Sequence, residues 1–583
     1  MTSASERSSP SSTAERTLGT AAIALLVFLV ALALRLAFWQ ATPDAGWADS
    51  VYYRGDAQMW MRYAAAPSPD GPFPFGLPLR PPGTAMLLAA LGGSVVVAKL
   101  IWCLLGSAAS ALLFLAARPC GLVPALTVGV GSAAATQLMI LSTSLNSEAP
   151  YLFLVSVQLA LWQPLRARGA APLLVGWGSA HALACLLRAE HLLFTVLATG
   201  ALLAVWLRHD RLSTALRGAV IVGSFVLVLL PWQLDAWAHC RGFNDDEPLL
   251  PPVVDRSYRD LERALHFMEW STGARSEVAQ LPAFCRRPMA LFVAATVAIR
   301  GGQRVEAEDF ELLEQAFGYR PEHVSSHPFV ALYGGLNFFL ANHPEADGGF
   351  SRRPLEKPPP MAGGTERYPA ALVQGLPPDD LALTYPPHLE ALNRGYLLGL
   401  EAIADDPLRF VRLVVSKLTH AWAGAAPTLG GWALPLGDDG LRRRVDMVVA
   451  TGVDATLWRI AWLGLALAGL RLAWRLPAAI PWLLFLGARI VIVAMFYGYA
   501  RHGAVALPVV LLLAGLWMQR AASRWPERRV LAIAGLATLT LLGAEALRSA
   551  SSPRILVDGT PVDQLTLPLR DAPEDRRLRI ESF

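Results

Sequence analysis

An acidic and aromatic segment, Asp49–Trp60, follows the first strongly apolar stretch of the chain and contains residue types that could do chemistry. It carries two carboxylates, Asp49 and Asp56, and Arg80 follows further along. An acid is costly to place at the mouth of an apolar helix bundle, so an acid found there indicates function. We interpret Asp56 as the catalytic carboxylate of a membrane enzyme and Asp49 as a solvated loop acid.

Other polar side chains stand at the ends of later apolar stretches: Glu148, Arg188, Glu190, His191, Arg501 and His502. Two acid-bearing turns that face two arginine-bearing turns could hold an anionic, lipid-linked substrate beside a general base. Structural roles remain open for the same residues. Asp56 could cap a helix or pair with Arg54, Glu148 could cap a helix, and Arg188 could pair with Glu190.

The composition places these groups in a membrane protein. Of 583 residues, 54% are hydrophobic and only 16% are charged, with a mean hydropathy of +0.40. We predict an all-α polytopic membrane protein with about eleven spans (eleven to thirteen allowed), since about 20 apolar residues cross a bilayer. The predicted spans are residues 18–40, 94–117, 121–142, 148–164, 171–188, 190–207, 215–236, 454–474, 477–498, 503–520 and 530–547.

These spans divide the chain into five parts. Residues 1–17 form a disordered cytoplasmic tail, and 18–236 form an N-terminal transmembrane module whose first external loop, 41–93, carries Asp56. Within that loop, Leu79–Leu91 is short and apolar, which favours an interfacial or re-entrant helix. Residues 237–446 form a mainly helical extracytoplasmic domain, 447–547 a C-terminal transmembrane module, and 548–583 an extracytoplasmic tail.

Two sequences in the external domain, Asp255–Trp270 and Val305–Phe317, have the apolar periodicity of amphipathic helices. A longer periodic stretch, Leu392–Trp422, is interrupted before Pro407, where Asp405 or Asp406 could cap a new helix. Cys240 and Cys285 both lie where a disulfide is chemically permitted, and whether they pair stays open.

The placement of arginines predicts the orientation. Arg118, Arg166, Arg208, Arg471 and Arg520 all fall in one set of loops, which the positive-inside rule assigns to the cytoplasm together with the N-terminus. The chemically interesting residues then share the external face. The net charge of +4 is explained by these loops and indicates no nucleic-acid partner. We expect Arg35 to extend to the membrane interface, and most of the tryptophans to form an interfacial belt.

Seven short motifs occur in a fixed order between residues 18 and 520: Gly55–Ala64, Arg80–Pro82, Asn146–Glu148, Leu187–Glu190, Leu230–Trp232, Tyr333–Pro344, and Tyr499–His502 with Pro508. In this order the chain resembles the GT-C glycosyltransferases, in the branch of the protein O-mannosyltransferases and lipid A aminoarabinose transferases. Two positions depart from the family pattern: Ala57 stands where many relatives have Glu, and Ala341 where Gly is usual.

The resemblance implies a GT-C bundle in a bacterial inner (plasma) membrane, with its active site on the extracytoplasmic side. It implies inverting transfer of a sugar from a polyprenyl-phosphate donor to a hydroxyl of a protein, lipid or polysaccharide, with Asp56 as general base. The donor phosphate or sugar would be bound by Arg80, Glu148, Arg188, Arg501 and His502, and the acceptor or sugar by Tyr63, Asn337 and Asn342. No cofactor is firmly implied, although Glu148 could help to hold a divalent cation.

Two other functions remain open at this point. A lipid or polysaccharide transporter or flippase would need structural repeats and broken spans near the midplane, and the sequence has no repeat of fixed period. A glycan ligase that uses a polyprenyl-pyrophosphate donor would use the same external arginines. The lipid product separates these readings, because only ligation releases a pyrophosphate.

Overall fold

A computed structural model of the chain describes residues 10–40, 46–48, 56–65, 77–208, 210–245, 252–325, 327–349, 353–356, 381, 383–427, 453–523, 555–557 and 560–562. These residues are mostly helical, and their only strands are two short pairs. Five of their helices are long and apolar enough to cross a membrane, or six if a bent pair is one span. The chain is therefore an all-α membrane protein.

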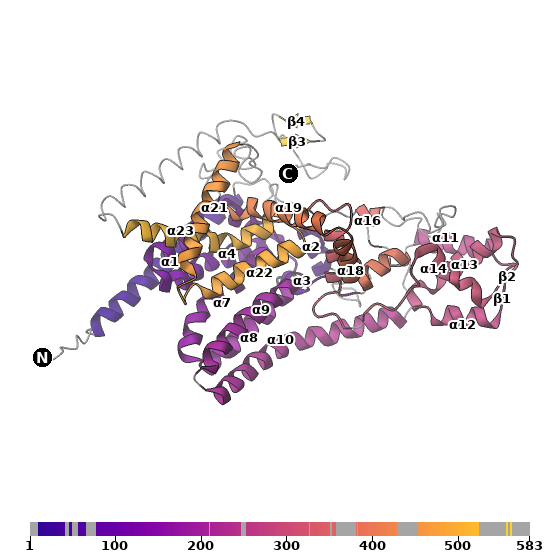
Figure 1. Ribbon diagram of the computed structural model, residues 1–583, viewed down its shortest axis with the longest axis horizontal. Helices are drawn as coiled ribbons and strands as arrows, with labels where there is room; N and C mark the ends of the chain where they lie inside the picture. The colour runs from indigo at the N-terminus through magenta and orange to yellow at the C-terminus, as the bar shows by residue number, and fades with distance from the viewer. Residues whose placement is uncertain are drawn as a thin grey trace.

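The N-terminal part of the bundle follows the predicted spans closely (Figure 1). Its helices are α1 (Pro10–Gln40), α2 (Ala57–Ala65), α3 (Gly83–Ala90), α4 (Val95–Ala117), η2 (Arg118–Cys120), α5 (Leu122–Ala134), α6 (Thr136–Thr143), α7 (Glu148–Arg168), α8 (Ala171–Leu187), η3 (Ala189–His191), α9 (Leu192–Leu207) and α10 (Arg211–Asp245). Helix α1 begins at Pro10, so residues 10–17 are helical rather than disordered. Helix α10 continues beyond the predicted end at residue 236.

The C-terminal part contributes α21 (Val453–Ala473), α22 (Ile480–Met495) and α23 (Ala500–Ala522), which match three further predicted spans. One large apolar core joins the two parts, and almost every side chain in the first two-thirds of α23 is buried in the bundle. The predicted span 530–547 lies outside the described residues, so the count of eleven stays a prediction. Four tryptophans are fully buried and therefore do not belong to the predicted interfacial belt: Trp102, Trp162, Trp177 and Trp482.

The prediction that Arg35 extends to the membrane interface is wrong. Arg35 is buried in the bundle rather than extended to the interface, because α5 and α6 meet at a bend of 51°. Backbone carbonyls at a helix end lack a helical partner and cannot stay unpaired away from water. Arg35 supplies that partner by donating to Ser132 O and Ala133 O at 3.3 Å each, while its Nε donates to Ser142 Oγ at 3.0 Å.

Gly106 on α4 leaves the space that this arginine occupies. A Cβ added at Gly106 would lie 2.2 Å from Ser142 Oγ and 2.9 Å from Arg35 Nε. We expect Gly106→Val to lower the free energy of unfolding by about 1–3 kcal/mol through overpacking, measured as the melting temperature of the detergent-solubilised protein. Gly200→Val in α9 is the control, since a Cβ there meets nothing within 4 Å. Equal melting temperatures for the two variants would contradict this packing.

The region from α11 to α19 is mainly helical, as predicted, apart from one short parallel strand pair (Figure 1). Its elements are α11 (Pro252–Ala264), β1 (Glu269–Trp270), α12 (Thr272–Gln280), α13 (Ala283–Ile299), β2 (Arg304–Val305), η4 (Ala307–Phe310), α14 (Glu311–Phe317), α15 (Tyr333–Asn342), α16 (Arg353–Glu356), α18 (Pro386–Asp405) and α19 (Pro407–Ala425). The predicted helix over residues 255–270 therefore ends at Ala264. In the tail, β3 (Ile555–Val557) pairs antiparallel with β4 (Thr560–Val562).

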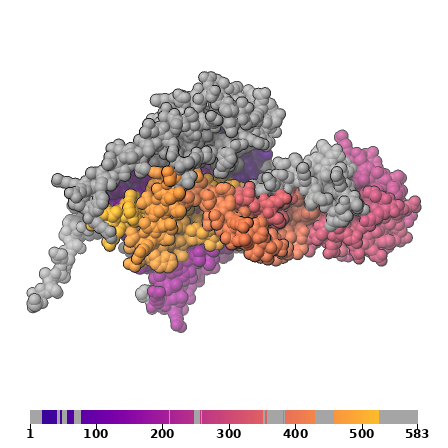
Figure 2. Space-filling view, turned by 45° about the horizontal axis from the view of Figure 1, so that its top comes forward, coloured from indigo at the N-terminus to yellow at the C-terminus, as the bar shows by residue number. Residues whose placement is uncertain are grey.

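Residues 252–325, from α11 to α14, form an outer lobe at one end of the elongated molecule (Figure 2). Cys240 and Cys285 belong to the apolar core of this region, but both thiols are free, so the disulfide left open by the sequence is not formed. Asp406 caps α19 by accepting a hydrogen bond from Arg409 N at 2.9 Å, which confirms the predicted helix start.

The region from α11 to α19 contacts the bundle at two places that matter for the site. Leu332 N donates to Pro78 O at 2.9 Å and Tyr333 N to Leu79 O at 3.0 Å, which joins the start of α15 to the segment before Arg80. Helix α19 packs against α23 so closely that a Cβ on Gly503 would lie 1.7 Å from Ala421 O. The first contact fixes the position of Arg80, and the second fixes the start of α23, which carries Arg501.

Candidate active site

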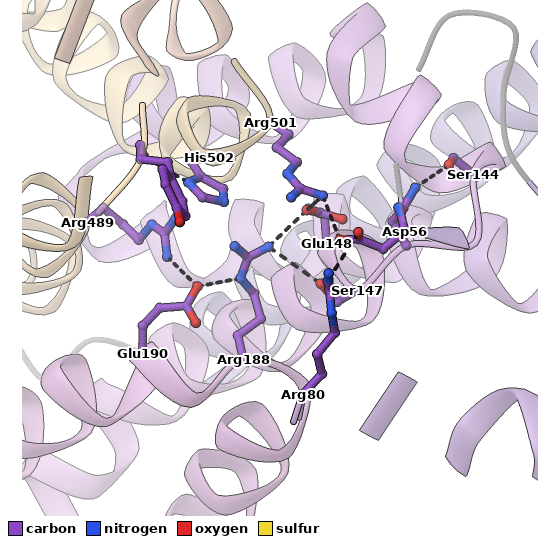
Figure 3. Close-up of polar contacts among 12 residues, drawn as sticks. Asp56, Arg80, Ser144, Ser147, Glu148, Arg188, Glu190, Arg489, Arg501 and His502 are labelled. Carbon is purple, nitrogen blue, oxygen red and sulfur yellow. Dashed lines mark hydrogen bonds and ion pairs between the residues drawn. The ribbon is translucent and has the colours of Figure 1, made fainter. Parts of the chain in front are cut away.

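Seven charged side chains from distant parts of the chain meet in the bundle, six of them at helix ends or in adjoining turns and one within α22 (Figure 3). We call them the charged cluster; its members are Asp56, Arg80, Glu148, Arg188, Glu190, Arg489 and Arg501. Five of the seven were predicted as site residues. The ion pairs run continuously from Arg80 at one end to Arg489 at the other.

The backbone of Asp56 is held by the turn that precedes α7. Asp56 N donates to Asn146 Oδ1 at 2.8 Å, and Trp102 Nε1 donates to Asn146 O at 2.7 Å. Asn146 thus links the start of α2 to α4 and to the turn that carries Glu148. The motif that contains Asn146 was recognised in the sequence, but its role as an anchor for Asp56 was not.

The carboxylate of Asp56 lies between two guanidinium groups. Its Oδ1 is 3.2 Å from Arg80 Nη1, and its Oδ2 is 3.3 Å from Arg501 Nη1. Partial burial favours the neutral acid, but the two positive charges outweigh that effect and lower the pKa of Asp56 to about 2. Asp56 is therefore ionised at neutral pH. The alternative partner Arg54 lies outside the described residues.

Glu148 is the buried acid of the cluster, with its side chain only 1% exposed. It is the first residue of α7, where the helix dipole favours a negative charge. Arg188 Nη1 donates to Glu148 Oε1 at 2.9 Å, and Arg501 Nη1 is 3.8 Å from the same oxygen. Glu148 Oε2 has no hydrogen-bond partner among the described residues. Glu148 therefore both begins α7 and forms ion pairs with Arg188 and Arg501.

Arg188 also pairs with Glu190, which extends the cluster into the bundle. Arg188 Nε donates to Glu190 Oε1 at 2.7 Å, and Arg489 Nη1 lies 3.5 Å from that oxygen. Sequence reasoning missed Arg489, although a lone arginine inside the apolar stretch Ile480–Met495 is a signal of function. Within the described part of the chain, its Nε and Nη2 atoms have no hydrogen-bond partner.

Each of three arginines lies over the ring of a tyrosine. The pairs are Arg80 with Tyr333 at 5.3 Å, Arg188 with Tyr151 at 5.6 Å, and Arg501 with Tyr499 at 5.2 Å. A tyrosine face attracts a guanidinium and leaves its N–H edges free to donate to anions. Tyr333 belongs to α15, so this helix helps to position Arg80.

His502 lies beside the ion pairs rather than within them (Figure 3), and Tyr63 lies in an apolar cluster. His502 is buried near Arg489, and its Nδ1 is 3.2 Å from Tyr497 O (Figure 3). Tyr63 packs edge-on against Trp60 in the apolar cluster around Trp102. Asn337 Oδ1 accepts a hydrogen bond from Tyr497 OH at 3.4 Å, which connects it to the segment before α23.

Asn342 does not fit its predicted contact with sugar or acceptor. It is fully buried at the end of α15, and both ends of its amide have protein partners. Asn342 Oδ1 accepts from Lys417 Nζ at 2.9 Å, and Nδ2 donates to Met495 O at 2.9 Å. Asn342 therefore joins α15 to α19 and α22. Asp49 lies outside the described residues.

The residues around Glu148 do not fit a divalent cation. The described residues hold no group of three or more acidic, histidine or cysteine side chains placed to bind a metal. Glu148 and Asp56 each face guanidinium groups, whose positive charge would repel a cation from the same oxygens. The donor set suits an anion, and we assign no metal to this site.

Comparisons of the chain with protein-family models, with curated proteins and with solved structures gave no match. A function is therefore inferred from the charged cluster itself and from the motifs that lead into it.

Proposed function

We propose that this protein is an inverting glycosyltransferase that moves a sugar from a polyprenyl-phosphate donor to a hydroxyl acceptor at the extracytoplasmic membrane face. One observation carries the proposal. The Asp56 carboxylate, which can accept a proton, lies directly between Arg80 and Arg501. The guanidinium groups of these two arginines are suited to bind a phosphate. The GT-C relationship, the eleven spans and the bacterial inner membrane are part of this proposal, as is the external position of the cluster.

The chemistry needs a base and an anion site side by side. Asp56 removes the proton of the acceptor hydroxyl while the acceptor oxygen forms a bond to the anomeric carbon. The bond from that carbon to the phosphate oxygen breaks, and its electron pair leaves with the polyprenyl phosphate. Attack from the face opposite the leaving group inverts the anomeric carbon. Arg80 and Arg501 stabilise the negative charge that develops on the phosphate.

The charge of the cluster favours a phosphodiester donor over a pyrophosphate donor. Its four guanidiniums stand against three carboxylates, which leaves one positive charge uncompensated within these seven residues. A sugar linked to a polyprenyl monophosphate carries a single negative charge, whereas the pyrophosphate carries two. Six of the seven charges lie at helix ends or in the turns beside them, and one, Arg489, lies within α22. This gathering near helix ends favours transfer over transport.

Arg501→Ala is expected to raise the KM for donor by about 10- to 100-fold, because it removes a charge-assisted contact worth about 1.5–3 kcal/mol. The measurement is transfer of radiolabelled sugar from defined polyprenyl-phosphate sugars by the protein in nanodiscs. Arg263→Ala is the matched control, since Arg263 pairs with Asp260 in the outer lobe away from the cluster. An unchanged donor KM in Arg501→Ala would count against a phosphate site here.

A further inference from the structure

The two most exposed arginines of the charged cluster are the two that hold Asp56. Arg80 and Arg501 are 22% and 21% exposed, against 10% for Arg188 and 4% for Arg489. Among the acids, Asp56 and Glu190 are 29% and 25% exposed, and Glu148 is 1% exposed. An anion that arrives from outside therefore meets Arg80 and Arg501 first. Both guanidiniums are already engaged, each by one oxygen of the same carboxylate.

This arrangement makes Asp56 a weak base as it stands. A carboxylate held by two guanidiniums has a low proton affinity, as the lowered pKa of Asp56 reflects. General-base catalysis is most effective when the pKa of the base lies closer to the working pH. The same contacts that place Asp56 at the site thus hold it in an unreactive state.

We propose that Asp56 occupies the binding position of the donor phosphate on Arg80 and Arg501, and that an arriving phosphate displaces it from both arginines. This inference rests on the proposed function. The exchange is a rotation of the Asp56 side chain, while the backbone of Asp56 keeps its hydrogen bond to Asn146, which is 2.8 Å long. The carboxylate therefore stays beside the donor after it has been displaced.

Displacement turns a held carboxylate into a working base. Asp56 loses two attractive positive charges and gains the negative charge of the phosphate as a neighbour, and both changes raise its pKa. Donor binding therefore prepares the base for the acceptor, which makes the donor the first substrate to bind productively. The acceptor proton is removed only at a site that already holds the donor.

Glu148 allows the exchange without leaving Arg501 unpaired. Its Oε1 stays 3.8 Å from Arg501 Nη1 and 2.9 Å from Arg188 Nη1, on the buried side of the cluster. Arg501 thus keeps an acidic neighbour while its outer contact changes from carboxylate to phosphate. The phosphate replaces one anion by another and does not need to enter the buried part of the network.

The test is direct binding of a short-chain polyprenyl monophosphate, which carries no sugar, to the solubilised full-length protein. Asp56→Asn keeps the shape of the side chain and removes its charge, so we expect it to bind the lipid about 10-fold more tightly than the wild type. Asp260→Asn is the matched control: it breaks an aspartate–arginine pair in the outer lobe and should leave the affinity unchanged.

A second background separates competition for the arginines from simple charge repulsion. In Arg501→Gln, the gain from Asp56→Asn should shrink severalfold, because one of the two shared contacts is gone. A gain of equal size in both backgrounds would show repulsion through space and would overturn the proposal. Unchanged or weaker binding by Asp56→Asn, with clear binding by the wild type, would also overturn it while leaving the proposed function intact. Failure of the wild type to bind the lipid would instead count against the polyprenyl-phosphate donor class.

Discussion

Asp56→Asn is expected to lower the rate of sugar transfer by a factor of about 10²–10⁴, the usual contribution of a general base. An alcohol is a poor nucleophile until its proton has an acceptor, and asparagine cannot accept that proton at neutral pH. The change is nearly isosteric, and the backbone contact of residue 56 with Asn146 does not depend on the side chain. The rate is measured with saturating donor, so that altered donor affinity does not enter the result.

The control for this variant is Asp260→Asn, which should keep wild-type transfer. Both variants should elute as the wild type does on size exclusion and should melt at a similar temperature. If Asp56→Asn is folded and transfers sugar at the wild-type rate, Asp56 is not the base and the mechanism proposed here is wrong.

Arg188→Met is expected to destabilise the protein by about 3–5 kcal/mol, because it removes one partner of a buried ion-pair network. Arg188 lies between Glu148 and Glu190, at 2.9 Å and 2.7 Å, and Glu148 is 1% exposed. Without Arg188, the charge of Glu148 stays buried with only Arg501 at 3.8 Å. The measurement is the thermal or denaturant midpoint of the solubilised protein, compared with Arg263→Met.

A second substitution should rescue part of this loss. Arg188→Met combined with Glu148→Gln removes the stranded charge and should recover a substantial share of the lost stability, because the two residues are directly coupled. A midpoint for Arg188→Met equal to that of Arg263→Met would show that the buried pair contributes little. An additive double variant would show that Arg188 acts through other contacts.

The helices of the bundle were largely predictable because apolar length alone marks them. Ten of the eleven predicted spans correspond to helices in the described residues, although the breaks within them were not foreseen. The bend at Ala135 has no proline or glycine beside it, so no local sequence signal predicts the unpaired carbonyls that Arg35 binds. A cation near a helix end looks the same whether it extends to the interface or satisfies a broken helix.

The members of the site were easier to predict than their pairing. Charged groups in an apolar chain stand out, so Asp56, Glu148 and Arg188 could be selected by type and position alone. That Arg501 contacts an aspartate 445 residues earlier depends on how α19 and α23 pack, which no local pattern contains. Arg489 was missed because it stands inside a predicted span, whereas the candidate residues were taken from the ends of spans.

The identity of the lipid released during transfer tests the central claim most directly. Purified wild-type protein in nanodiscs is supplied with a polyprenyl-phosphate sugar and a hydroxyl acceptor, and the lipid products are analysed by mass spectrometry. We predict free polyprenyl monophosphate in amounts equal to the glycoside formed, and release slowed by a factor of about 10²–10⁴ in Asp56→Asn. Release of a pyrophosphate from the corresponding donor, or monophosphate release at the wild-type rate in Asp56→Asn, would contradict the proposed mechanism.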